Sequence, residues 1–221
     1  MAASSPSTAA RLERVGTALL ADVLDQLGHR TSFLGTGIMA LAPSTRLAGP
    51  ALTIRCEPSE PGRREPGGDY HALFEVLAER HDEAVIVIAG AEHHSGLWGE
   101  LLSTAAVARG ITGVVVDGAT RDLDGIAATG LRVFARGVSP LDSAGRQWFA
   151  DHGGPVGIGD ATIRSGDWIV GDDLGVIAVP AELCDTALEL AEEKMAGEST
   201  VRRELRDGDD LRTVFDRHGI L

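Results

Sequence analysis

The stretch GELLSTAAVARGITGVVVDGATRD, residues 99–122, contains one helix and one strand with charged residues at both ends. Its first half favours a helix, and the valine-rich run 113–118 is typical of a strand covered on both faces of a parallel sheet. Glu100 begins the helix, and Arg121 and Asp122 follow the strand. Because successive strand–helix units of a parallel sheet bring their loops to the same edge, we expect these three side chains to meet over one cleft.

Segments on both sides of this unit repeat its pattern. AVIVIA (84–89) and LRVFARG (131–137) are further short apolar runs that predict buried strands. A helix is expected at 122–130, between the central unit and the strand at 131–137. Asp69 is expected to cap another helix, which runs to about Arg80. Three strand–helix repeats favour an α/β core with parallel pairing.

The remaining segments have a different character. GPALTIRC (49–56) predicts a strand, and the apolar spacing of residues 17–27 predicts a helix before it. The segment 155–180 contains short strands separated by Gly-Asp turns, which indicates an antiparallel or barrel-like part. A long helix is expected over 181–195, followed by a charged tail.

Length and composition indicate one globular domain. The chain has 221 residues, of which 43% are apolar and 24% charged. We expect a flexible N-terminal tail at 1–11, because it lacks the basic N-terminal region and the long apolar run of a signal peptide, and a single α/β domain over 12–221 with a C-terminal helical tail. Cys56 and Cys184 are too few for a disulfide framework and are expected to be buried, reduced thiols of a cytoplasmic protein.

The charge balance excludes some classes of partner. Thirty-three acids against 20 bases give a formal net charge of −13, which repels nucleic-acid backbones, so no nucleic-acid partner is expected. No run of apolar residues approaches the length of a membrane span, so no membrane partner is expected either. The acidic excess fits a solvated surface or a means of holding a divalent cation.

Each residue type at the expected cleft has a chemical use. The first residues of the central helix have N–H groups without partners inside the helix, and such groups hold small anions such as a carboxylate. These residues are Gly99, Glu100, Leu101 and Leu102. Arg121 offers a fork of donors for a carboxylate or an enolate oxygen, Asp122 is a hard oxygen ligand for Mg²⁺ or Mn²⁺, and Glu100 can move a proton directly or through water. An ordinary helix cap with a surface ion pair would place the same residues there, and this alternative stays open.

The pattern Gly99-Glu100, twenty residues, then Arg121-Asp122 resembles the active-site signature of the 4-hydroxy-4-methyl-2-oxoglutarate aldolase family, which also contains the regulator of ribonuclease E activity A. The resemblance extends over residues 12–221, through GPALTIRC, VVVDGATRD, LRVFARGVSP and the Gly-Asp turns, in the order typical of that family. It implies a swivelling β/β/α-type, RraA-like fold that assembles as a homotrimer or a dimer of trimers.

The resemblance also implies an activity, that of a metal-dependent class II pyruvate aldolase. Members of the family cleave 4-hydroxy-4-methyl-2-oxoglutarate or a related oxo acid to pyruvate and a second oxo acid, and many decarboxylate oxaloacetate. By this resemblance, the N–H groups of residues 99–102 bind the pyruvyl carboxylate and Arg121 holds the keto or enolate oxygen. Asp122 ligates Mg²⁺ or Mn²⁺ largely with waters, and Glu100 orients the water that protonates the enolate carbon. The alternative function is a non-catalytic, protein-binding regulator of a ribonuclease.

Three features depart from the family pattern or go beyond it. Relatives often carry another acid shortly after the Arg-Asp pair, and here that acid is missing or its role falls to Asp124. A carboxylate from a neighbouring subunit often completes the site, and Glu198 is the first candidate, with Glu193 the second. His93 and His94 either contact the distal end of the substrate or are plain surface residues.

Overall fold

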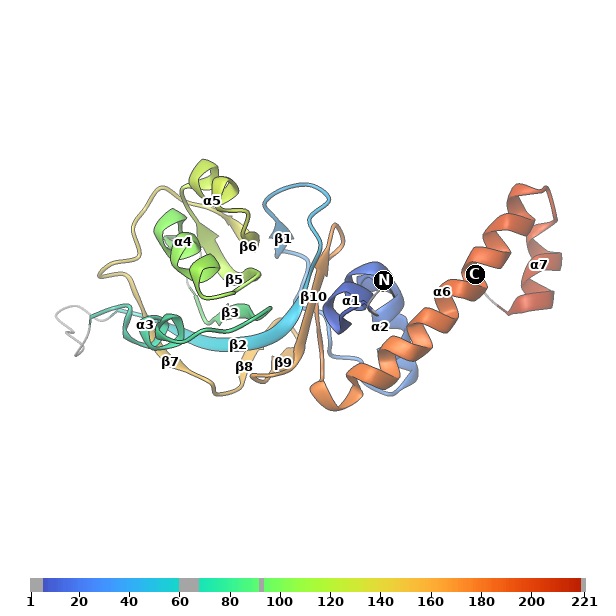
Figure 1. Ribbon diagram of the computed structural model, residues 1–221, viewed down its shortest axis with the longest axis horizontal. Helices are drawn as coiled ribbons and strands as arrows, with labels where there is room; N and C mark the ends of the chain where they lie inside the picture. Colours follow the sequence, from blue (N-terminus) through green and yellow to red (C-terminus); the bar gives the residue numbers. More distant parts are fainter. Residues whose placement is uncertain (1–5, 60–67, 92–93, 220–221) are drawn as a thin grey trace, which may run out of the picture.

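A mixed β-sheet forms the centre of the computed structural model, which describes residues 6–59, 68–91 and 94–219 (Figure 1). Its strands are β1 (Met39–Ala40), β2 (Leu47–Pro58), β3 (Val85–Ala89), β4 (Gly96–Trp98), β5 (Gly113–Thr120), β6 (Arg132–Val138), β7 (Gln147–His152), β10 (Trp168–Asp172) and β11 (Gly175–Val179). Within the described residues the order is β1-β6-β5-β3-β2-β10-β11, with β4 beside β5 and β7 beside β2. Because β1 lies next to the β10–β11 hairpin, the sheet curls into a nearly closed, barrel-like form.

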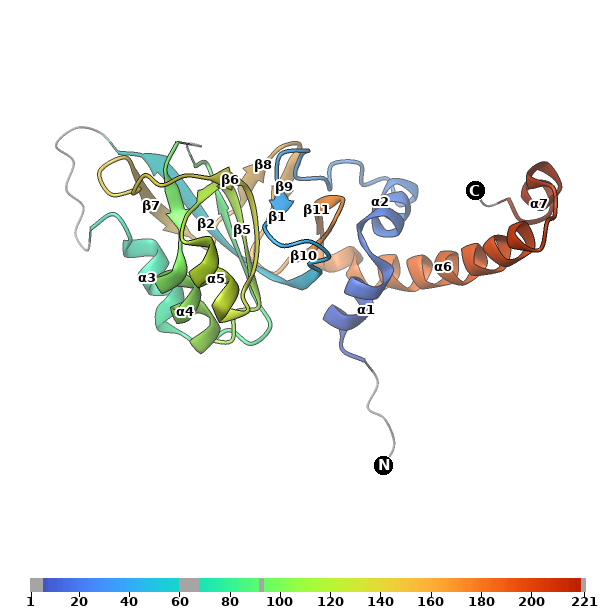
Figure 2. The same cartoon turned by 90° about the horizontal axis from the view of Figure 1, so that it is seen from above.

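The helices lie in two places (Figure 1). They are α1 (Thr8–Val15), α2 (Thr17–Gln26), α3 (His71–Ala78), α4 (Glu100–Ala108), α5 (Leu123–Thr129), a 3-10 turn at Ala181–Leu183, α6 (Cys184–Arg206) and α7 (Leu211–His218). Figure 2 shows α3, α4 and α5 together on one side of the sheet, with β8 (Val156–Ile158) and β9 (Ala161–Ile163) on the other. No described helix is long and apolar enough to cross a membrane.

The parallel core forms as its β-branched runs predict. β2, β3, β5 and β6 pair in parallel, and every residue of β3 is buried. Alternate residues of β3 face different layers: Ile86 and Ile88 pack with the helices α3, α4 and α5, whereas Val85 and Val87 pack with β8 to β11. Each fully buried aliphatic side chain of this kind stabilises the fold by about 1.5–3 kcal/mol. The strand and helix predictions for residues 84–137 are confirmed, with ends shifted by at most two residues.

The antiparallel part expected at 155–180 is confirmed. β8 pairs with β9, and β10 pairs with both β11 and β2, all antiparallel. Gly159, in the turn between β8 and β9, has a φ of 57°, and a Cβ there would meet the backbone of Leu34 at 3.1 Å. The turn therefore requires a glycine.

Helices α1, α2 and α6 pack on each other beside the sheet, around residues that include Leu12, Leu20, Leu24 and Leu188. The prediction of a flexible tail over 1–11 is wrong from Thr8 onward, because α1 begins there and buries Leu12. The helix expected to end at Met195 continues to Arg206, running away from the sheet, and α7 folds back on its far end (Figure 1).

Two further details of the chain differ from the sequence predictions. Asp69 does not cap α3: the helix begins at His71, and an Asp69 carboxylate oxygen accepts the N–H of Gly145 at 2.8 Å instead. The strands β4 and β7 were not predicted from the sequence. β4 has only three residues, which are too few to show a periodicity. β4 matters most, because it adds to the sheet edge at which the charged residues lie.

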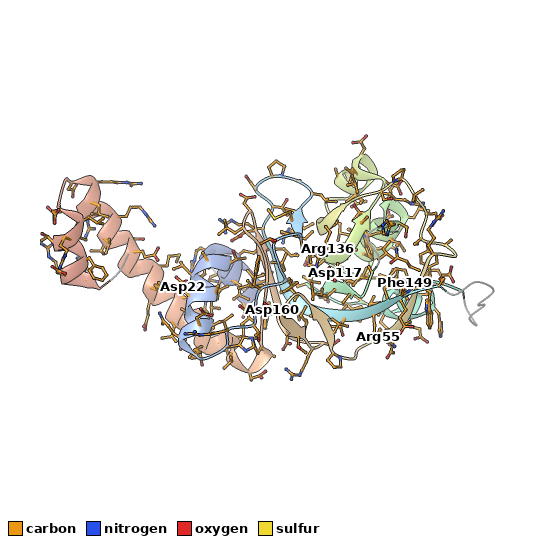
Figure 3. The ribbon with its side chains drawn as sticks, turned by 180° about the vertical axis from the view of Figure 1, so that it is seen from behind. Asp22, Arg55, Asp117, Arg136, Phe149 and Asp160 are labelled. Atoms are coloured by element: carbon orange, nitrogen blue, oxygen red, sulfur yellow. The ribbon has the colours of Figure 1, made fainter. Side chains whose placement is uncertain are left out.

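Charged residues inside the sheet have partners of their own. Asp117 on β5 forms an ion pair with Arg136 on the neighbouring strand β6 (Figure 3). Cys56 and Cys184 are free and buried, as predicted, and desolvation raises the pKa of Cys56 to about 12 and the pKa of Cys184 to about 11. None of these groups lines the cavity described next.

Candidate active site

Glycine at position 99 allows the two halves of the site to touch. The N–H of Arg121 donates to the carbonyl of Trp98 at 2.9 Å, so the end of β5 runs directly beside the end of β4. A Cβ at Gly99 would lie 2.5 Å from an Asp122 carboxylate oxygen. The structure therefore brings together Gly99, Arg121 and Asp122, as the order of strands and helices predicts.

Asp122 has an unusual backbone conformation. Its φ of 58° and ψ of 45° lie in the left-handed region, where a residue other than glycine costs of the order of 1–3 kcal/mol. Asp122 occupies the N-cap position of α5, yet its side chain makes no capping hydrogen bond. The carboxylate is therefore turned toward Gly99 instead of the helix it precedes, and 47% of the side chain is exposed.

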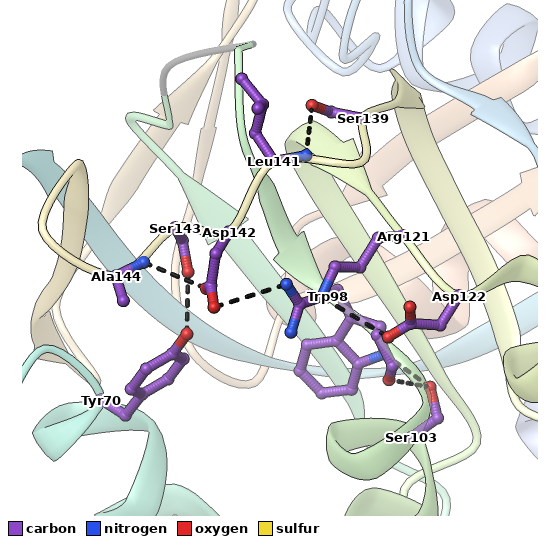
Figure 4. A network of polar contacts seen from close by, with 11 residues as sticks. Tyr70, Trp98, Ser103, Arg121, Asp122, Ser139, Leu141, Asp142, Ser143 and Ala144 are labelled. Carbon is purple, nitrogen blue, oxygen red and sulfur yellow. Dashed lines mark hydrogen bonds and ion pairs between the residues drawn. The ribbon is translucent and has the colours of Figure 1, made fainter.

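Arg121 lies between two carboxylates (Figure 4). Its Nε is 3.5 Å from Asp122 Oδ2, and its Nη1 is 3.5 Å from Asp142 Oδ2. The N–H of Ala144 and the Arg121 guanidinium lower the pKa of Asp142 below its ordinary value. Beside Asp142, the hydroxyl groups of Tyr70 and Ser143 are 2.9 Å apart. The guanidinium is thus oriented on both sides by anionic groups.

The first turn of α4 opens toward this guanidinium. Gly99 provides no side-chain cap, so the leading N–H groups of the helix are left for a ligand or water. The turn itself is held by a buried relay in which Trp98 Nε1 donates to Ser103 Oγ at 2.8 Å and Ser103 Oγ donates to the Gly99 carbonyl at 2.9 Å. A small anion placed here would gain the N–H groups, the helix dipole and a nearby cation together.

Glu100 is placed differently from the other predicted residues. Its side chain lies against α5, where a Cβ at Gly125 would be 2.7 Å from Glu100 Cγ. It is exposed and does not line the cavity that Gly99, Arg121 and Asp122 share. Glu100 can therefore act on a bound ligand only through water or after a change of side-chain conformation.

A cavity of about 280 Å³ lies next to these residues. The polar groups Arg121 and Asp122 line one part of it, and Tyr70, Phe74 and Leu101 line another. A larger cavity, of about 480 Å³, lies between α3 and β7 and is lined by Glu75 and His152, whose side chains are 3.0 Å apart. We place the site at the smaller cavity, because the free start of α4, the Arg121 guanidinium and the Asp122 carboxylate meet there.

The donor set fits one kind of metal ion. No group of three or more His, Cys, Asp or Glu side chains among the described residues is arranged to hold a metal. Asp122 supplies a single hard carboxylate, which suits Mg²⁺ or a similar ion that keeps most of its waters and is completed by ligand oxygens. It does not suit zinc, which takes three or four protein ligands, mostly histidine nitrogen and cysteine sulfur.

Other predicted residues lie away from this cavity. Glu198 is on the distant half of α6, where it pairs with Arg202 at 3.7 Å, and could reach such a cavity only in another copy of the chain (Figure 1). Asp124 is exposed in the first turn of α5. His93 lies outside the described residues, and His94 is exposed, with its carbonyl accepting from Ser139 Oγ at 2.8 Å.

Asp142 and Tyr70 are site residues that the sequence analysis missed. Asp142 follows the third parallel strand, β6, so it leaves the sheet at the same edge as Arg121 and Asp122. The rule that located Arg121 could have located Asp142 as well. Tyr70 had no comparable signal, because it reaches the site from the start of α3.

The fold and the site define a class of protein that comparison with known families identifies. The chain matches a family model described as RraA-like, Aldolase/RraA, over residues 17–178. The chain belongs to this RraA-like family. The fold class expected from the resemblance is thereby confirmed.

Individual relatives are similar at moderate identity. Protein DlpA of Legionella pneumophila is 31% identical over 176 residues, which make up 79% of this chain but only 28% of DlpA. A protein of Halalkalibacterium halodurans described as "putative 4-hydroxy-4-methyl-2-oxoglutarate aldolase" is 29% identical, over 87% of this chain and 86% of that protein. The crystal structure of Streptomyces coelicolor RraAS2, described as an unusual member of the RNase ES inhibitor RraA protein family, has a TM-score of 0.78 at 27% identity and covers 90% of this chain and 98% of that one.

Proposed function

We propose that the protein is a metal-dependent carbon–carbon lyase that cleaves a 4-hydroxy-2-oxo acid to pyruvate and a second carbonyl compound. Decarboxylation of oxaloacetate is expected as a second activity. The observation that carries the proposal is the contact of Gly99 with Asp122, which holds a carboxylate and the Arg121 guanidinium beside the free start of α4. Relatives described as aldolases support the same class of reaction.

Each described residue has one task in this reaction. The N–H groups at the start of α4 bind the substrate carboxylate. Arg121 donates to the C2 oxygen, on which negative charge develops when the C3–C4 bond breaks. Water oriented by Glu100 returns a proton to C3, and Asp122 would hold the metal ion. A divalent cation bound there supplies Lewis-acid stabilisation of the same developing charge.

Cleavage and decarboxylation need the same stabilisation. In both reactions a bond at C3 breaks and its electron pair moves toward the C2 carbonyl. One site that stabilises charge on the C2 oxygen therefore serves both. This reasoning explains why we expect two activities from one set of residues.

The experiment follows pyruvate release from oxaloacetate and from 4-hydroxy-4-methyl-2-oxoglutarate with added Mg²⁺. Arg121→Ala should lower kcat/KM by about a hundredfold or more, because a donor aimed at the developing charge is lost. The control is Arg164→Ala, on the β9–β10 connection away from the cavity. Equal rates for wild type and Arg121→Ala with every oxo acid tried would rule the proposal out.

The similarity to RraAS2 favours one alternative, a regulator that binds a ribonuclease. Such a protein would act through its surface, and Asp122→Ala would leave the association unchanged. A lyase would instead lose pyruvate release in that variant. Measuring both properties in one preparation separates the two functions.

A further inference from the structure

Apart from Arg121 and Asp122, the residues that line the cavity are apolar, aromatic or glycine, and we call this lining its apolar half. Phe74 on α3 and Leu101 on α4 line it from different helices, and their side chains are 54% and 82% exposed. Trp98 and Leu102 also contribute to the lining. Large apolar side chains gathered from separate elements around one cavity, next to a polar site, are a common feature of ligand pockets.

The aromatic part of this lining is held in place. The rings of Tyr70 and Phe74 are stacked with centroids 5.8 Å apart, and the rings of Tyr70 and Phe149 are 5.5 Å apart. Phe149 is buried, and the Tyr70 hydroxyl pairs with that of Ser143. Tyr70 is thus fixed from both sides, which leaves a preformed apolar surface for Phe74 to extend.

The charges around the cavity oppose a second anionic group. Among the described residues that line it, Arg121 is the one cation, and it already lies 3.5 Å from both Asp122 and Asp142. In the proposed reaction Arg121 and the metal ion that Asp122 would hold both act on the C2 oxygen, so the described lining offers no further cation for a distal carboxylate. A carboxylate moved from water into the apolar half would lose hydration and gain no cation in return.

We infer that the distal group of the substrate is uncharged and apolar, an alkyl or aryl group attached at C4, and that it occupies this half of the cavity. The inference rests on the proposed lyase function. It departs from the dicarboxylic substrate named in the descriptions of two relatives. Phe74 and Leu101 are then specificity-determining residues.

The reaction balances for such a substrate. The C3–C4 bond breaks, the C4 hydroxyl gives up its proton, and C4 becomes the carbonyl of an aldehyde or ketone that carries the apolar group. The electron pair of the broken bond goes to C3, which is protonated to give the methyl group of pyruvate. No oxidant or reductant is needed.

The test compares two substrates that differ at one group. 4-Hydroxy-2-oxo-4-phenylbutanoate and 4-hydroxy-2-oxoglutarate share C1 to C4 and carry a phenyl or a carboxylate at C4. With Mg²⁺ present, kcat/KM for the phenyl compound should be higher by about tenfold or more, the range that one apolar group commands in an apolar pocket. A preference for the carboxylate compound overturns the inference.

Variants of the lining test where the preference arises. Phe74→Ala should lower kcat/KM for the phenyl compound more than for the carboxylate compound. Leu101→Arg should shift the preference toward the carboxylate compound, because it adds a cation at an exposed position of the lining. The matched control is Leu174→Arg, which changes a 66% exposed leucine away from this cavity and should leave the preference unchanged. A preference that none of the lining variants alters would also overturn the inference.

A separate measurement distinguishes failure of the inference from failure of the lyase proposal. Exchange of the pyruvate methyl protons with deuterated water requires the same C2 stabilisation but involves no distal group. If the protein catalyses this exchange and prefers the carboxylate substrate, the lyase proposal stands and the apolar inference fails. If it catalyses neither exchange nor cleavage, the lyase proposal fails and the inference fails with it.

Discussion

The two ends of the molecule are held together in different ways. At the sheet edge, Gly99, Arg121 and Asp122 are positioned by close backbone approach, and the charged side chains stay partly exposed. At the opposite end, α1, α2 and α6 are joined by fully buried aliphatic side chains such as Leu20 and Leu188. The contrast indicates that buried side-chain packing holds the helical end together, whereas close backbone contacts set the functional geometry at the sheet edge. Substitutions at each end should therefore affect different properties.

The largest effect on stability is expected from Leu188→Ala. Leu188 on α6 is 1% exposed and lies in the buried cluster that α6 forms with α1 and α2. Removing its side chain should lower the free energy of unfolding by about 2–5 kcal/mol. Urea denaturation measures this change, and pyruvate release per folded molecule should stay unchanged. The control is Leu190→Ala on the same helix, where the leucine is 36% exposed and the loss should be within about 0.5 kcal/mol. Equal losses in the two variants would contradict the contrast.

Gly99→Ala is expected to lower the rate of pyruvate release rather than the stability of the fold. The new Cβ would lie 2.5 Å from Asp122 Oδ2, so the carboxylate or the start of α4 must move. A displacement of about 1 Å at a reacting centre costs about a hundredfold in rate. Gly157→Ala is the control, because the nearest atom to a Cβ there is 4.0 Å away. Full activity in Gly99→Ala would show that the contact has no catalytic use.

A smaller effect is expected from Asp142→Asn. Asp142 contacts Arg121 and not the predicted position of the substrate, so we describe it as a positioning residue. Loss of its charge should lower kcat by about tenfold, because the guanidinium loses one of its two orienting anions, while KM changes less. The exposed Asp160 provides the control Asp160→Asn. A change in KM alone would assign Asp142 to substrate binding instead.

Sequence reasoning was most successful where local pattern determines structure. The runs 84–89 and 113–118 form β3 and β5 because β-branched residues buried on both faces have few other conformations open to them. The order of strands and helices then placed Arg121 and Asp122 at one edge. A regular pattern that spans several residues can therefore predict both the core and part of the site.

Features that depend on distant contacts were not predicted. The order of strands places the loop of Asp142 at the edge where Arg121 lies, but the pairing of Asp142 with Gly96 on β4 was not predictable, because a three-residue strand leaves no pattern to detect. The first half of α1 was assigned to a tail because residues 1–11 contain no long apolar run, and the buried residues of the helix, Leu12 and Val15, come after them. Its stability depends on α6, which lies more than 170 residues later in the sequence.

Removing the charged contact between α1 and α6 is expected to have the smallest effect on the free energy of unfolding. Arg11 makes two hydrogen bonds to Glu192, at 2.7 and 3.1 Å, and Arg14 adds an ion pair at 2.5 Å. The Arg11 hydrogen bonds lower the pKa of Glu192 below its ordinary value of 4.5, and Arg14 acts in the same direction. Because these groups are near the surface, Glu192→Gln should lower the free energy of unfolding by only about 1 kcal/mol or less at neutral pH.

The pH dependence of that loss tests its electrostatic origin. A carboxylate with a lowered pKa stabilises the fold fully above its unfolded value of 4.5, and the contribution disappears as the pH falls through the lower, folded pKa. The difference between wild type and Glu192→Gln should therefore be constant above pH 4.5 and shrink below it, as measured by urea denaturation. The exposed Glu182 supplies the control Glu182→Gln. If the difference in the free energy of unfolding stayed unchanged at acid pH, the effect of Glu192 would come from packing of its side chain on α1 and not from its charge.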